Sequence, residues 1–228
     1  AQDKGYAERN PEADVEGHDA CRKIAILTSL ISGQHVDFEK IHTEGITKIT
    51  TEDMKYAKKL NMAIKLLASS KRVGDTFSVL VAPMLLSEEH PLCNVNDVFN
   101  AVFVRGNMLG DAMFYGSGAG KLPTASAVVA DVVDAAKHLH RNVVTRWDAG
   151  ELELIPNAEA EHRFFVRVQG RSEAQKEQIR EAFGSVEIVE TEGLEDEFGF
   201  ITEVMTEGTY SKKAEAFPEI IHMIRLAD

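Results

Sequence analysis

The order of secondary-structure patterns over residues 161–228 constrains the fold more than any other feature of the sequence. Strand, helix, strand, strand, helix and strand patterns follow one another there: HRFFVRVQG, RSEAQKEQIREAFG, SVEIVETEG, FGFITEVMTEG, YSKKAEAFPEII and HMIRLA. The order βαββαβ is that of a ferredoxin-like unit. We therefore expect the chain to end in a small module of this type.

Local signals predict helices and strands before this module as well. Helical spacing of apolar residues runs from Gly17 to a stop at Gly33, and a second helix begins at Thr50 or Thr51. Strand patterns follow, the last two joined as a Gly-containing hairpin: MAIKLLASS, TFSVLVAPMLLS, VFNAVFVRG and GDAMFYG. The expected fold class is α+β, a mixed β-sheet covered by helices and followed by the ferredoxin-like module.

A change in composition suggests where the chain divides. Residues 142–160 are polar and contain Gly150, which is typical of a linker. We therefore expect a first domain over residues 1–141, ending in a helix over 121–140, and a second domain over residues 161–228.

Composition excludes several classes of protein. No segment approaches the roughly 18 apolar residues of a membrane span, and the polar N-terminus does not resemble a signal peptide. The formal net charge of −12 argues against nucleic acid or an anionic membrane as partner. The only cysteines are Cys21 and Cys93, so we expect no disulfide framework and a cytoplasmic location. Cys21 is expected to be a buried small hydrophobe.

The histidines do not indicate a metal site. Those of the first 90 residues lack the spacing of metal ligands and have no cysteine pair nearby: His18, His35, His42 and His90. We expect no metal.

A glycine-rich stretch opens the long helical pattern YGSGAGKLPTASAVVADVVDAAKHLH. It is not a P-loop, which would need glycine at Tyr115 and Ser or Thr at Leu122, and it is not the dinucleotide fingerprint GxGxxG. Two interpretations stay open. The glycines allow close approach of a ligand to the helix N-terminus, or they form a tight strand-to-helix turn without a ligand.

Asp19 and Lys23 lie four residues apart on the first helix and therefore share one face. Such a pair is either a surface ion pair or part of a site.

Several long segments resemble homoserine dehydrogenases: GYAERNPEADVEGHDACRKIAIL, EGITKITTEDMKYAKKL and VFNAVFVRGNMLGDAMFYGSGAGKLPTASAVVADV. The resemblance implies NAD(P)-dependent interconversion of L-aspartate 4-semialdehyde and L-homoserine in threonine, methionine and isoleucine biosynthesis. The Rossmann domain with which the family begins is not found in this sequence. We therefore expect a fragment, consisting of the catalytic and dimerisation domain and the C-terminal module, that is inactive alone.

The resemblance also implies roles for individual residues. Lys23 matches the lysine that donates and accepts the proton at the substrate oxygen. Glu8 and Asp19 match carboxylates that hold the substrate ammonium. Asp14 matches a further acidic position near the site, or it caps the helix after Gly17.

The cofactor, NADP or NAD, would be bound mainly by the absent domain. Gly5 and Gly120 match glycines whose backbone approaches it. In the family the helix after Gly120 packs on the Rossmann domain, so we expect the apolar stripe of this helix to be partly uncovered here or covered by a neighbouring molecule.

The C-terminal position often holds an ACT domain in the family. The usual ligand turn after the first strand is replaced by Gly170-Arg171-Ser172. The resemblance implies threonine as an effector, whereas the replaced turn favours a role in assembly alone, and both interpretations stay open. The VFNAVFV strand is expected to lie in the core or in the interface of a homodimer or homotetramer.

Two other functions compete with this one. The chain could be an amino-acid-sensing or assembly module with a non-catalytic dehydrogenase-like domain, or part of another NAD(P) dehydrogenase. Glu8, Asp19 and Lys23 are all present, which favours the enzyme.

Overall fold

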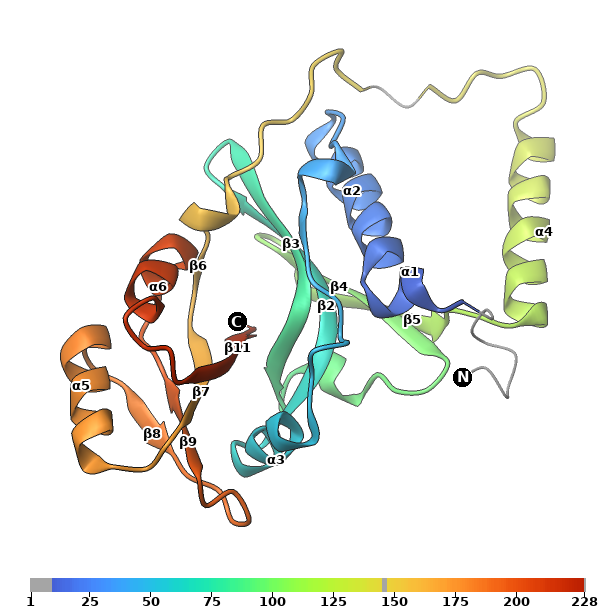
Figure 1. The fold of residues 1–228 in the computed structure, drawn as a ribbon. Helices are drawn as coiled ribbons and strands as arrows, with labels where there is room; N and C mark the ends of the chain where they lie inside the picture. The colour runs from blue at the N-terminus through green and yellow to red at the C-terminus, as the bar shows by residue number, and fades with distance from the viewer. Residues whose placement is uncertain (1–9, 145–146, 228) are drawn as a thin grey trace. The chain divides into compact units, whose positions relative to one another are not determined.

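The computed structural model describes residues 10–144 and 147–227 (Figure 1). Two compact units form. Among the described residues, we call 12–88 with 148–227 the large unit, and 10–11 with 89–144 and 147 the small unit. None of the helices in the described ranges is long and apolar enough to cross a lipid bilayer.

The large unit is built on a seven-stranded mixed sheet in the order β1-β3-β11-β7-β9-β8, with β2 paired to β3. Its strands are β1 His42–Thr43, β2 Met62–Val73, β3 Thr76–Ser87, β7 Phe164–Gln169, β8 Glu187–Val189, β9 Glu197–Ile201 and β11 Ile220–Leu226. A separate two-stranded ladder pairs β6 Glu161–His162 with β10 Met205–Thr206. The predicted α+β class is confirmed.

Strand β3 joins the two halves of this sheet. It pairs with β2 in antiparallel fashion along its whole length. Its other edge pairs in parallel with β1 at Leu80 and Val81, and with β11 at Met84 and Leu85. Because β11 is also the neighbour of β7, the C-terminal strands continue the sheet that β2 and β3 begin.

Helices α2 and α3 begin where local signals predict, and α2 also ends at the predicted glycine. Helix α1 spans Glu12–Val15, and α2 spans His18–Ser32 and ends at Gly33, which adopts the left-handed conformation at φ 75°. Helix α3, Thr51–Lys59, begins with a capping box formed by Thr50 and Asp53. The large unit also contains two 3-10 turns, η2 Phe38–Lys40 and η4 Asn157–Glu159.

The predicted βαββαβ order is confirmed. Strand β7 is followed by α5 Glu173–Phe183, β8, β9, α6 Glu207–Ala214 and β11. One face of β7 packs with α5 and α6 through Phe164, Val166 and Val168. Its other face, which carries Phe165, packs with Tyr56 and Ala57 of α3. Both faces of β7 are therefore covered, which explains why all five residues of FFVRV are buried.

The small unit consists of a hairpin and a long helix. Strands β4 Phe99–Gly106 and β5 Gly110–Ser117 pair in the predicted hairpin, η3 Pro91–Asn94 precedes them, and α4 spans Lys121–Lys137. No residue of α4 is buried, and its valines are exposed: Val128, Val129, Val132 and Val133. The apolar stripe is thus uncovered within this chain, and the surface on which it packs stays a prediction.

The segment predicted as a linker makes regular contacts from Asp148 onward. Asp148 donates its amide to Gly33, and Leu152 donates to His35, while Leu154 forms a bridge with Phe77. Residues 148–155 therefore run along the large unit, and this unit includes residues on both sides of the predicted boundary. The three predicted domain ranges stay a prediction.

Candidate active site

The junction of α1 and α2 carries the predicted substrate residues that the structure describes. Gly17 separates the two helices with φ 79°, a left-handed conformation that glycine adopts readily. Helix α2 then packs its buried face on the sheet through Cys21, Ile24 and Ala25. Asp19 and Lys23 consequently lie on the outward face.

Lys23 and Asp19 form the expected i,i+4 pair. Lys23 Nζ lies 2.6 Å from Asp19 Oδ2, and the two side chains are 69% and 47% exposed. A pair this exposed stabilises a helix by only about 0.3–0.5 kcal/mol. Both groups are therefore accessible, and their pairing does not by itself distinguish a site from a surface ion pair.

Asp14 lies on α1 and is exposed. The alternative that Asp14 caps the following helix is wrong, because the N-cap residue of α2 is Gly17 and no side chain caps this helix. The backbone carbonyl of Asp14 instead accepts a hydrogen bond from the Gly17 amide at 3.3 Å. Glu8 and Gly5 lie outside the described residues.

The glycine loop belongs to the small unit. Gly120 precedes α4 with φ 119°, and its carbonyl accepts the Thr124 amide at 3.1 Å. Gly118 has a structural explanation, since a Cβ there would lie 1.6 Å from Asn100 Nδ2. Tight packing against the hairpin therefore accounts for Gly118, and Gly120 is the glycine of this loop at the helix start.

A backbone loop after β1 holds the α1–α2 junction in place. The amide of Ile46 donates to the carbonyl of Val15 at 2.8 Å, and the amide of Glu44 donates to Val81 at 2.8 Å. Between them, a Cβ on Gly45 would lie 2.3 Å from the Val15 oxygen, so only glycine fits. The chain before α2 thus lies directly on residues 44–46.

Arg225 of β11 binds the side chain of this loop. Its Nη1 and Nη2 donate to the two carboxylate oxygens of Glu44 at 3.0 and 2.8 Å. The same guanidinium contacts both oxygens of Glu207, and His42 Nε2 lies 2.6 Å from Glu44 Oε1. Only 2% of the Arg225 side chain is exposed. Charge-assisted bidentate pairs of this kind have a fixed geometry.

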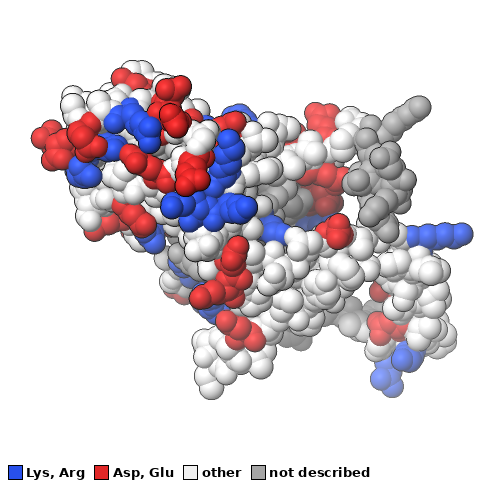
Figure 2. Space-filling model, turned by 90° about the horizontal axis from the view of Figure 1, so that it is seen from below, with Lys and Arg blue, Asp and Glu red and all other residues white. Residues whose placement is uncertain are grey.

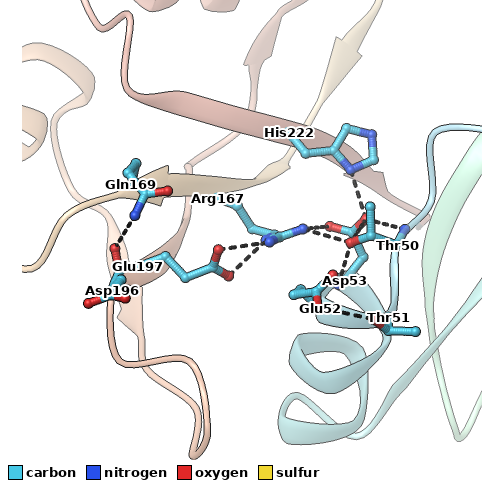
Figure 3. Close-up of polar contacts among 9 residues, drawn as sticks. All are labelled: Thr50, Thr51, Glu52, Asp53, Arg167, Gln169, Asp196, Glu197 and His222. Carbon is cyan, nitrogen blue, oxygen red and sulfur yellow. Dashed lines mark hydrogen bonds and ion pairs between the residues drawn. The ribbon is translucent and has the colours of Figure 1, made fainter.

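A second buried arginine lies near the start of α3 (Figure 3). Arg167 of β7 points between two carboxylates, donating to Glu197 at 3.0 and 2.8 Å and to Asp53 at 2.8 Å. It also donates to Thr50 Oγ1 at 2.9 Å, and His222 Nδ1 lies 3.0 Å from the other oxygen of Asp53. Side chains of β7 and β11 therefore hold the capping box of α3 in place.

The two networks set the charge state of their carboxylates. Burial acts to raise the pKa of Glu44, but hydrogen bonds from His42 and Arg225 outweigh it and lower the pKa to about 2. Burial likewise opposes ionisation of Asp53, whose hydrogen bonds to His222, Arg167 and the Thr50 amide hold its pKa well below its usual range. Both groups are ionised at neutral pH.

A small cavity of about 160 Å³ lies between residues 43–49 and residues 222–224 of β11. Its volume suits water or a very small molecule, because pockets for larger ligands measure roughly 300–1,000 Å³. It cannot hold a dinucleotide.

The surface charge of the C-terminal module is mixed in sign. Figure 2 shows acidic and basic side chains interspersed on the visible face of the C-terminal module, on the left, without a continuous basic patch. Within residues 10–144 and 147–227, no three His, Cys, Asp or Glu side chains gather in a way that could hold a metal ion. Cys21 is 5% exposed, as predicted for a buried hydrophobe.

Sequence analysis did not identify the two buried arginines or their partners. Arg167 and Arg225 each stand between apolar residues of a strand, FFVRV and HMIRLA, and this is the only local signal. Their partners Asp53 and Glu44 lie more than 100 residues earlier in the chain. Pairing of this kind depends on tertiary structure.

Comparison with known proteins identifies relatives of the whole arrangement. The family model for homoserine dehydrogenase matches residues 1–133. The Bacillus subtilis homoserine dehydrogenase is 46% identical over 143 residues, which are 63% of this chain and 33% of the relative. The Mycobacterium bovis homoserine dehydrogenase is 35% identical over 95% of this chain and 54% of its own. The crystal structure of a Thiobacillus denitrificans homoserine dehydrogenase matches 100% of this chain and 57% of its own, with TM-score 0.86 and 32% identity.

Proposed function

Because the chain belongs to the homoserine dehydrogenase family, we propose that it supplies the substrate-binding and proton-transfer part of an NAD(P)-dependent enzyme. This enzyme interconverts L-aspartate 4-semialdehyde and L-homoserine. The chain spans about a third to a half of the length of the curated relatives it matches, in line with a part of such an enzyme. The observation that carries the proposal is the family match over the segment that contains Asp14, Asp19 and Lys23.

Lys23 is the proposed proton carrier. The nicotinamide, when bound, supplies or accepts the hydride at the substrate carbon. Reduction of the aldehyde leaves an alkoxide that needs a proton, and the Lys23 ammonium can donate it and take it back in the reverse direction. The exposed position of Nζ makes the group accessible to a substrate, and Asp19 Oδ2 at 2.6 Å orients it.

Asp19 can serve a second purpose at the same time. One of its carboxylate oxygens binds Lys23, which leaves the other able to accept a hydrogen bond from the substrate ammonium. Glu8 is the proposed second carboxylate, and Asp14 on the neighbouring short helix is a further acidic group near the site.

Gly120 and Gly5 are the proposed cofactor contacts. Gly120 fits this role because its φ of 119° is a conformation that residues with side chains rarely adopt, at the start of a helix. NADP or NAD would be held mainly by a part of the enzyme that this sequence does not contain. The exposed valines of α4 are the proposed surface on which that part packs.

We further propose that residues 161–228 act as an ACT-like regulatory or assembly module. The strand order β11-β7-β9-β8 supports this comparison. Gly170, at φ 110°, and the α5 cap Ser172 form the turn where a threonine effector would bind in an ACT domain. The sequence of this turn favours assembly. A homodimer or homotetramer in the cytoplasm completes the proposal, with the exposed β4–β5 hairpin as the candidate interface.

The experiment is hydride transfer by the complete native polypeptide with homoserine and each nicotinamide cofactor, followed by reduced-nicotinamide absorbance. We expect Lys23→Ala to lower kcat by about 10²–10⁴-fold while homoserine still binds. Lys59→Ala, an exposed lysine at the end of α3, is the matched control and should retain kcat.

Two outcomes would contradict parts of the proposal. A native enzyme that does not oxidise homoserine would favour the alternative, an amino-acid-sensing or assembly module with a non-catalytic dehydrogenase-like domain. A Lys23→Ala enzyme with normal kcat would leave Lys23 as only the ion-pair partner of Asp19.

A further inference from the structure

Strand β11 pairs with β3, and β3 is a strand on which α2, the predicted substrate helix, packs. Arg225 and Leu226 of β11 pair with Met84 and Leu85 of β3, and the Ala227 amide donates to the Leu85 carbonyl at 2.8 Å. Arg225 therefore lies at the parallel junction of the two sheet halves, with its side chain 2% exposed.

The Arg225 guanidinium is committed on both of its edges. Its Nη1 and Nη2 bind the two oxygens of Glu44, and its Nε and the same Nη2 contact the two oxygens of Glu207 on α6. The imidazoles of His42 and His162 face the same carboxylates, at 2.6 Å from Glu44 and 3.9 Å from Glu207. A planar fork with fixed donors holds both carboxylates in one geometry, which a lysine ammonium cannot reproduce.

Glu44 in turn fixes the backbone against which α2 begins. The next residue, Gly45, lies in backbone contact with Val15, and the Ile46 amide donates to the Val15 carbonyl at 2.8 Å. A Cβ on Gly17 would lie 3.1 Å from Val81 Cγ1 and 3.4 Å from the Glu44 carbonyl oxygen. Residues 43–46 therefore pack closely against Gly17, the residue that precedes α2.

We propose that Arg225 is a positioning residue for the dehydrogenase reaction: through Glu44 and the 44–46 backbone it sets the place of the α2 N-terminus, and so of Asp19 and Lys23. The inference rests on the proposed function of these two residues. According to this inference, strand β11 of the C-terminal module positions the substrate site. Misplacement of a catalytic group by about 1 Å can lower the rate by about 10²-fold.

Arg167 provides a matched control. It is also buried, with 4% of its side chain exposed, and it also binds two carboxylates across the same large unit. Its partners are Asp53 and Glu197, however, and it holds α3 rather than α2. Arg225→Lys and Arg167→Lys therefore remove equivalent buried contacts with different consequences for the site.

The test measures kcat and both KM values of the complete native polypeptide with each variant, at a temperature where both are folded. We expect Arg225→Lys to lower kcat with homoserine by about 10- to 100-fold and to leave KM for the nicotinamide cofactor unchanged. Arg167→Lys should lower the unfolding midpoint similarly but keep kcat within about 2-fold. Glu44→Gln should reproduce the Arg225→Lys loss, and the double variant should lose no more than either.

Amide hydrogen exchange of the same proteins separates this inference from the proposed function. Arg225→Lys should accelerate exchange over residues 18–24 of α2, and Arg167→Lys should do so over residues 51–57 of α3. If the native enzyme is inactive on homoserine but this exchange pattern holds, the proposed reaction fails and the positional link stands. Equal kcat losses in the two variants, or unchanged exchange in α2, would overturn the inference.

Discussion

Replacing Arg167 with methionine tests the buried network of Figure 3 most directly. Methionine retains much of the apolar stem that packs over Tyr56, where the guanidinium carbon lies 5.9 Å from the ring centroid. The change therefore removes the positive charge and its hydrogen bonds. It leaves Asp53, fully buried, and Glu197, 11% exposed, without the cation between them.

The expected loss of stability follows from this geometry. Removing one partner of a buried ion pair costs about 3–5 kcal/mol, because the remaining charge is buried without compensation. His222 and the Thr50 amide still bind Asp53, so we expect the lower end, about 3 kcal/mol. At about 2–4 °C per kcal/mol for a chain of this size, Tm should fall by about 6–12 °C.

The assay is urea unfolding followed by far-ultraviolet circular dichroism. Arg180→Met is the control, since Arg180 and Glu177 form an exposed pair at 3.1 Å. That variant should change the free energy of unfolding by less than about 0.5 kcal/mol. A loss below about 1 kcal/mol for Arg167→Met would refute the argument that the buried carboxylates depend on this cation.

The pH dependence gives a second check on the same variant. The lowered pKa of Asp53 contributes stability that is fully present above its unfolded pKa of 3.8 and is lost as pH falls toward the folded value. In Arg167→Met the carboxyl protonates more easily. The difference in stability between native and variant proteins should therefore narrow below about pH 4.

Two further changes test the loop that supports α2. Gly45→Ala places a Cβ 2.3 Å from the Val15 oxygen and should lower the free energy of unfolding in urea by about 1–3 kcal/mol. The control Gly150→Ala places its Cβ in open space and should be nearly neutral. Equal losses in the two variants would contradict the close packing of the loop. The pKa of Glu44 lies at about 2 against an ordinary 4.5, because hydrogen bonds from the neighbouring imidazole and guanidinium outweigh burial. The stability that it contributes should be present above about pH 4.5 and decline toward pH 2, and Glu44→Gln should flatten this part of the stability–pH curve; an unchanged curve would show that other carboxyls dominate acid unfolding.

The helix ends, the hairpin and the order of the C-terminal elements could be predicted because capping residues, turn residues and apolar spacing act locally. Gly33 ends α2 because glycine accepts the left-handed conformation, and Thr50 begins α3 because its hydroxyl accepts the Asp53 amide. The β4–β5 hairpin and the βαββαβ order follow from alternation and turn residues. Each of these signals acts within a few residues of the chain, so the sequence alone contains it.

Pairing between distant segments could not be predicted in the same way. The parallel contact of β11 with β3 joins residues about 140 positions apart, and no local pattern specifies this register. Coverage of the second face of β7 by α3 is equally non-local. Lys23 and Asp19 were predicted to share a face, which their contact confirms, whereas their chemical roles stay a prediction.

The C-terminal module cannot be separated from the N-terminal part of the large unit without exposing a shared core. Tyr56 and Leu85 from the first part of the chain share one apolar core with Phe165 and Ile224 from the last part. Arg167 and Arg225 add ion pairs between the last part of the chain and the first. Arg167 pairs with Asp53, and Arg225 pairs with Glu44. A chain that ended near residue 160 would expose this core and leave Asp53 and Glu44 without their cations. Residues 161–227 therefore stabilise the N-terminal part of the large unit, through the core that they share with α3 and through the ion pair to Glu44.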